Sequence, residues 1–169
     1  MIFLALALLG SSGAFAQDDA IGKFFGKYLD DSRFTVISIS PRMFRLIGSI
    51  KWDTVAAEVQ EEAKKLTSFR AISTTTTPMV FYKEAMARID LNRYEPLITV
   101  RNKDANTRFL IREEGGTIRE LVMISVDNDQ FNVISFVGDI DLDKLSKLTA
   151  DLNFNGGLQH LQDNKQKNH

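Results

Sequence analysis

The chain contains no cysteine, and this absence removes several classes of function. Without cysteine there is no disulfide framework, no thiol catalysis and no cysteine-ligated metal site. Histidine is nearly as scarce, because His160 and His169 are the only two and both lie in or beside the C-terminal tail. A hydrolase that uses a histidine base needs that base held in a cleft by an orienting group. The sequence therefore predicts neither a serine–histidine–aspartate triad nor a histidine metal site.

The chain also lacks an excess of charge of either sign. Its 21 basic and 22 acidic side chains give a net charge of −1, which favours neither nucleic acid nor anionic lipid as a partner. The glycine pairs Gly115-Gly116 and Gly156-Gly157 lack the strand-to-helix context of a phosphate-binding loop. We therefore expect no cofactor and no nucleic-acid partner.

Long apolar runs are absent apart from one at the N-terminus. Ile2 to Leu9 is apolar throughout, and Ala14-Phe15-Ala16 fits the pattern that signal peptidase reads. The run is shorter than the ~20 residues that span a bilayer. We interpret residues 1–16 as a signal peptide cleaved between Ala16 and Gln17, which predicts a periplasmic or secreted protein. A lipid anchor on cysteine is excluded, and the lack of a basic residue before the run predicts a start codon further upstream.

Residues 17–162 are predicted to form a single α+β domain, followed by a disordered polar tail at 163–169. Apolar residues at helical spacing between Ile21 and Leu29 predict a first helix. Ser40-Pro41 and Thr77-Pro78 each combine a capping hydroxyl with a proline at the first helical position, which predicts two further helix starts. Asp53 or Thr54 is expected to cap another helix.

In the second half of the chain the period of the apolar residues changes to two. This pattern predicts four strands, at residues 97–100, 108–112, 118–126 and 131–137. Short polar turns join them, and Gly115-Gly116 suits a tight hairpin. The fold class is therefore α+β: a four-stranded antiparallel meander, extended by one or two N-terminal strands and packed by helices. The inner strands are apolar at consecutive positions and need cover on both faces. Helices or a second copy of the chain, in a homodimer, supply this cover.

Five stretches resemble an exported bacterial family, the domain of unknown function (DUF) 4252. The resemblance covers residues 20–161 and implies an exported protein of Gram-negative envelopes. It brings neither an established activity nor site residues. The matching stretches are 19–28, 34–44, 81–85, 108–113 and 138–143.

Acidic and hydroxyl side chains form three small candidate sites. Asp139, Asp141 and Asp143 alternate like calcium ligands, but no central glycine follows, so we interpret them as caps of a last helix. Thr54 lies in a short Asp-Thr-aliphatic sequence that resembles an O-glycosylation site. The run Thr74–Thr77 is interpreted as a solvated connector whose last threonine caps the next helix.

Two clusters combine basic and aromatic residues in the way that protein interfaces do. Arg42 and Arg45 flank Phe44 in one predicted helix, and Tyr82 precedes Lys83 in another. We predict that these five residues contact a partner.

The absence of a catalytic constellation favours a non-enzymatic envelope protein that binds a partner protein or senses the state of the envelope. One alternative is a carrier with a closed pocket of ~300 Å³ or more, lined by Phe and Met, for a small apolar ligand. Another is a glycan hydrolase that uses two carboxylates facing each other across a cleft.

Overall fold

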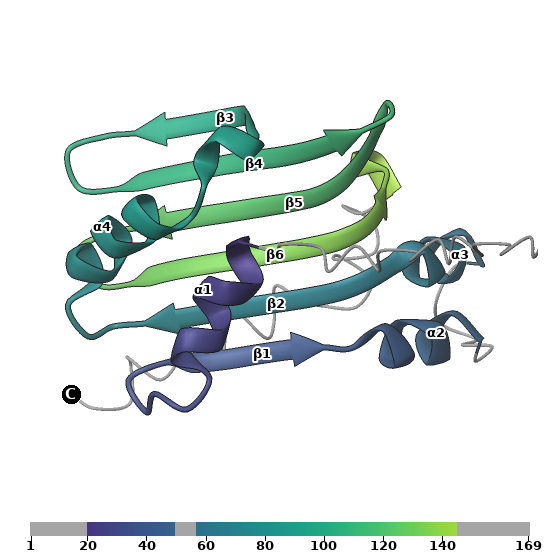
Figure 1. Ribbon diagram of the computed structural model, residues 1–169, viewed down its shortest axis with the longest axis horizontal. Coiled ribbons are helices and arrows are strands. Elements are labelled where there is room, and N and C mark those ends of the chain that lie inside the picture. Colours follow the sequence, from purple (N-terminus) through teal and green to yellow (C-terminus); the bar gives the residue numbers. More distant parts are fainter. Residues whose placement is uncertain (1–19, 50–56, 145–169) are drawn as a thin grey trace, which may run out of the picture.

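The computed structural model describes residues 20–49 and 57–144, which form one six-stranded antiparallel sheet with helices packed against it (Figure 1). The strand order across the sheet is β1-β2-β6-β5-β4-β3. The predicted α+β class is thus confirmed, with two N-terminal strands added to the meander. The strands are β1 (Thr35–Ile39), β2 (Leu66–Thr74), β3 (Glu95–Arg101), β4 (Asn106–Glu114), β5 (Thr117–Val126) and β6 (Phe131–Ile140).

The meander β3 to β6 is built from three consecutive hairpins. Gly115 and Gly116 both have positive φ, +60° and +77°, which is the backbone of the tight turn predicted between β4 and β5. In the next turn the Asp127 carboxylate accepts the backbone N–H groups of Asp129 and Gln130, at 2.8 and 2.7 Å. Local turn chemistry therefore fixes the order of these strands.

The two N-terminal strands join the meander through β2, which lies beside β6. Phe69 pairs with Phe136 and Ile72 with Val133 in this antiparallel register. Gly138 sits where β6 passes the start of β2, and its φ of +153° is rarely adopted by other residues. A β-carbon there would lie 2.3 Å from the Lys65 carbonyl oxygen, so only glycine permits this close approach.

One face of the sheet is covered by helices α1 (Ala20–Tyr28) and α4 (Pro78–Arg88), as Figure 1 shows. Phe24, Tyr28 and Phe81 pack there in a cluster of edge-on rings above the apolar residues of β5 and β6. The cluster forms the larger of the two cores. It arises because α1 and α4 each bring an apolar stripe to the same half of the sheet.

The start of α4 differs from the prediction. Thr77 has φ +42° and ψ +57°, a left-handed conformation, and its side chain makes no capping hydrogen bond. Its carbonyl oxygen instead accepts the N–H of Val80, and the Thr74 hydroxyl accepts the N–H of Thr76. Thr74 is also buried, so the interpretation of the whole threonine run as a solvated connector is wrong at that residue.

Helices α2 (Pro41–Ser49) and α3 (Ala57–Lys65) pack together at one end of the sheet, beside β1 and β2 (Figure 1). They share a second core on the other face of the sheet with Phe69 and Phe136. Gly48 lies at the contact between the two helices, where a β-carbon would be 2.3 Å from Lys64 Cγ. Glycine therefore sets how closely α2 and α3 approach.

Several predicted features lie outside the described residues. These are the signal peptide, Thr54 with the start of its helix, the helix expected after Asp143 beyond residue 144, both histidines and the polar tail. Across residues 20–49 and 57–144, no helix is both long enough and apolar enough to cross a membrane.

Candidate functional site

Helix α2 has one buried face and one face of arginine and apolar side chains in solvent. Ser40 caps the helix by accepting the Met43 N–H at 3.4 Å, and Pro41 occupies its first position, as predicted. Phe44 is fully buried and Ile47 nearly so. This anchoring leaves Arg42, Met43, Arg45 and Leu46 exposed.

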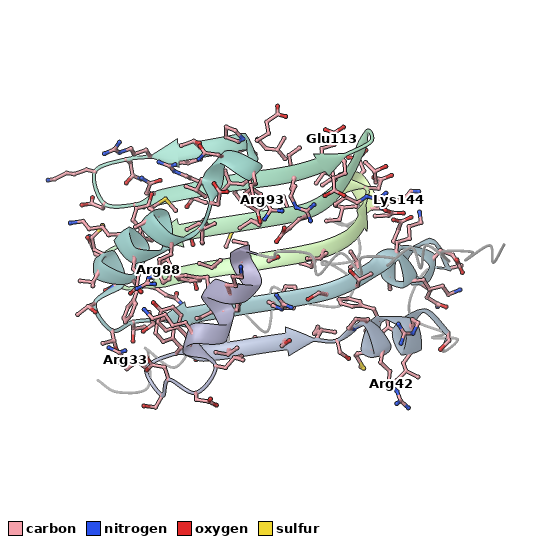
Figure 2. The ribbon with its side chains drawn as sticks, viewed as in Figure 1. Arg33, Arg42, Arg88, Arg93, Glu113 and Lys144 are labelled. Atoms are coloured by element: carbon pink, nitrogen blue, oxygen red, sulfur yellow. The ribbon has the colours of Figure 1, made fainter. Side chains whose placement is uncertain are left out.

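The exposed face of α2, formed by Arg42, Met43, Arg45 and Leu46, is called here the α2 surface. Met43 and Leu46 are 47% and 44% exposed. Neither arginine forms an ion pair with any residue in the described part of the chain. In Figure 2 the Arg42 side chain projects away from the helix.

The structure separates the five residues that the sequence grouped as partner contacts. Phe44 and Tyr82 belong to the two cores and are 0% and 8% exposed, so their rings are not at the surface. Lys83 is exposed on α4, which lies at the opposite end of the molecule from α2 (Figure 1). Only Arg42 and Arg45 share a surface. Whether that surface contacts a partner stays a prediction.

A buried charged network lies on the helix-covered face of the sheet, and the sequence did not predict it. Glu120, only 2% exposed, accepts hydrogen bonds from the Tyr94 hydroxyl and the Ser135 hydroxyl, each at 2.9 Å. Its third donor is Arg112 Nε at 3.4 Å, and Arg112 also forms an ion pair with Glu114. The buried carboxylate is therefore compensated by three donors.

The alternation within β5 could have revealed this network. Val122, Ile124 and Val126 are buried on one face of the strand, and Glu120 falls on the same face by the period of two. A charged residue at an inward position requires a partner. Arg112 is the residue directly opposite Glu120 in the register of β4 and β5.

A pocket of about 430 Å³ opens at the end of the sheet beside this network. Two of its lining carboxylates are each paired with an arginine: Glu114 with Arg112, and Asp139 with Arg119. This differs from the acid–base pair that a glycan hydrolase needs. The pocket is lined mostly by polar residues, so it gives no support to an apolar carrier. Its lining residues are Lys65, Thr67, Glu114, Arg119, Val137, Gly138 and Asp139.

A charged cluster at the surface joins α1 to α4. Glu84 forms ion pairs with Lys27 and, at 2.7 Å, with Arg88. The hydrogen bond from Lys27 lowers the pKa of Glu84, and the same bond raises the pKa of Lys27. Burial raises the pKa of the neighbouring Tyr28. The ion pair between Lys27 and Glu84 therefore connects α1 to α4.

A family model for a domain of unknown function, DUF4252, matches residues 28–148, which is well over half of the sequence. The chain belongs to the DUF4252 family. The matched residues of this DUF4252 chain include α2, the Arg112–Glu120 network and all six strands. Searches of curated proteins and of solved structures find no match. The family carries no assigned enzymatic activity, so function rests on the geometry of the chain itself.

Of the three calcium-like carboxylates of this DUF4252 chain, Asp141 takes the capping role expected for them. The Asp141 carboxylate accepts the backbone N–H groups of Asp143 and Lys144, at 3.1 and 3.3 Å. Asp139 is engaged by Arg119 instead. Across residues 20–49 and 57–144, no three Asp, Glu, His or Cys side chains gather in a way that could hold a metal ion.

Proposed function

We propose that this DUF4252 chain is an exported, non-enzymatic protein of the bacterial envelope that binds a partner protein through the α2 surface. One observation carries the proposal: α2 buries Phe44 and Ile47 while Arg42, Arg45 and two apolar side chains remain in solvent. Arginine and methionine are enriched at protein interfaces, and arginine is prominent among the residues that dominate binding energy.

The charge and apolar character of the α2 surface indicate which kind of protein surface it would bind. Arg42 and Arg45 are three residues apart and therefore neighbours on one side of the helix. No described acidic residue pairs with either. The complementary partner is an acidic protein surface with apolar side chains that cover Met43 and Leu46. The predicted signal peptide supports an encounter in the envelope.

The proposal is tested by charge reversal on α2. The purified chain lacking residues 1–16 is used to capture proteins from an envelope extract, and the bound partner is identified and its binding measured. Arg42→Glu/Arg45→Glu should weaken binding at least roughly tenfold, because like charges then face each other. High salt should weaken the wild-type complex, since exposed charges are screened.

The matched control is Lys83→Glu, which reverses an exposed charge on α4 at the other end of the molecule. It should leave binding unchanged. Urea unfolding of both variants checks that each is folded. Equal binding by the wild type and the α2 variant would rule out the α2 surface as the interface. Equal losses in both variants would show an effect of overall charge instead.

A further inference from the structure

β3 is an edge strand in which every residue is exposed. Leu97, Ile98 and Val100 are 42%, 53% and 55% exposed. The other edge strand, β1, differs because its apolar side chains are partly buried. Proteins usually cover an edge strand or guard it with charges, since its unpaired N–H and C=O groups can pair with another strand. Among residues 20–49 and 57–144, β3 therefore combines an edge that no strand covers with exposed apolar side chains.

The pairing of β3 with β4 shows which backbone groups are free. The Asn102 N–H donates to the Ala105 carbonyl at 3.0 Å and closes the hairpin. Hydrogen-bonded pairs alternate along an antiparallel ladder, so Val100, two residues before Asn102, directs its N–H and C=O toward β4. Thr99 and Arg101 therefore direct their N–H and C=O groups away from the sheet, where they can form hydrogen bonds with a further strand.

We propose that a second copy of this chain binds along β3, with the two β3 strands antiparallel and Thr99 opposite Thr99 of the second copy. In this register the outward N–H and C=O groups of Thr99 on each strand can form hydrogen bonds with those of Thr99 on the other strand. Pro96 has no N–H to donate and limits the ladder on one side, while the turn at Asn102 limits it on the other. Pro96 and Asn102 are each three residues from Thr99, so the paired segment is centred on Thr99 and the two strands contribute equally. The two sheets join into one.

The side chains of β3 are self-complementary in this register. Ile98 lies opposite Val100 of the second copy, and the reverse pair repeats by symmetry, so four exposed apolar side chains form one cluster. The same register brings Glu95 close to Arg101 and Lys103 of the second copy. Opposite charges across a strand pair are stabilising. Apolar contact and charge therefore favour the same alignment.

The strand pairing is short, so it buries less than the ~1,600 Å² of a standard interface. We expect a dimer that dissociates on dilution. Because β3 and α2 are separate elements, the dimer does not depend on partner binding through α2.

The absence of native cysteine allows a direct test by cross-linking. Thr99→Cys should give a disulfide-linked dimer on oxidation, because residues directly opposite each other lie within disulfide range. Lys103→Cys, on the adjacent turn, is the control: the two copies of residue 103 would be roughly 25 Å apart, so no dimer should form. Mixing Ile98→Cys with Val100→Cys should link one variant to the other, which checks the register.

Sedimentation of the chain lacking residues 1–16, over a range of concentrations, gives the second readout. Val100→Lys should raise the dissociation constant at least roughly tenfold, because a charge is placed opposite Ile98 twice per dimer. Val80→Lys, at an equally exposed valine on α4, should leave it unchanged. A monomer at every concentration would overturn the proposal. So would equal cross-linking at residues 99 and 103, or a β3 edge occupied by a different protein.

Discussion

Arg112 and Glu120 lie directly opposite each other on β4 and β5, both less than a tenth exposed, with Arg112 Nε 3.4 Å from Glu120 Oε2. A charged pair at this depth is costly to bury and stabilises the fold only because it is fully partnered. Tyr94, the residue before β3, and Ser135 on β6 complete that partnership. The network therefore couples neighbouring strands at one end of the sheet.

Removing one member of this pair should destabilise the protein strongly. Glu120→Ala removes the buried carboxylate that faces Arg112, and we expect a loss of about 3 kcal/mol in the free energy of unfolding. The double variant Arg112→Met/Glu120→Leu removes both charges and should recover most of that loss. Urea unfolding measures all three proteins. If the double variant is no more stable than the single one, the charge pair is not what the alanine variant disturbs.

Gly138 should be intolerant of a side chain. In Gly138→Ala the new β-carbon would lie 2.3 Å from the Lys65 carbonyl oxygen and 2.8 Å from Leu66 Cα, both backbone atoms that cannot rotate away. We expect a loss of about 2 kcal/mol or more.

Gly26 in α1 supplies the matched control for this substitution, since a β-carbon added there would have no atom within 4 Å beyond its own helix backbone and chain neighbours. Gly26→Ala should stabilise the helix by about 0.5–1 kcal/mol, because alanine loses less conformational entropy than glycine. Thermal or urea unfolding of the two variants should therefore shift in opposite directions. Shifts of the same sign and size would contradict the close approach of β2 and β6.

Tyr28 should make stability depend on pH in the alkaline range. Burial raises the pKa of its hydroxyl above that in the unfolded chain, which is about 10. The folded protein then holds the proton more tightly, so this contribution is fully present below pH ~10 and is lost as the pH rises through the folded pKa. Tyr28→Phe cannot ionise and should gain stability relative to the wild type above pH ~10. Urea unfolding at about pH 8 and about pH 11 measures this, and parallel losses in the two proteins would contradict it.

The meander could be predicted from the sequence because its signals are local. Alternation in residues 118–126 and the glycine pair at Gly115-Gly116 specify strand and turn without reference to the rest of the chain. The ends of strands are harder to predict: β2 begins at Leu66, directly where α3 ends. Leu66 is buried in the core beneath α3, and such tertiary contacts override local preference.

Pairings between distant segments could not be read from the sequence. Nothing local indicates that β2 lies beside β6, because that contact depends on how the whole sheet closes. The same limit applies to the candidate sites. Arg42 and Arg45 were found from their spacing, whereas the burial of Phe44 and Tyr82 became visible only with the cores in place.

The α2 surface is tested most directly by site-specific photo-crosslinking in living cells. A photoreactive residue at Met43, on α2, is compared with one at Met79, on α4, because the two methionines are 47% and 48% exposed. We predict an adduct with an acidic envelope protein from position 43 only, and its loss when Arg42→Glu/Arg45→Glu is added. Equal adducts from positions 43 and 79, or an adduct that survives charge reversal, would contradict partner binding through α2.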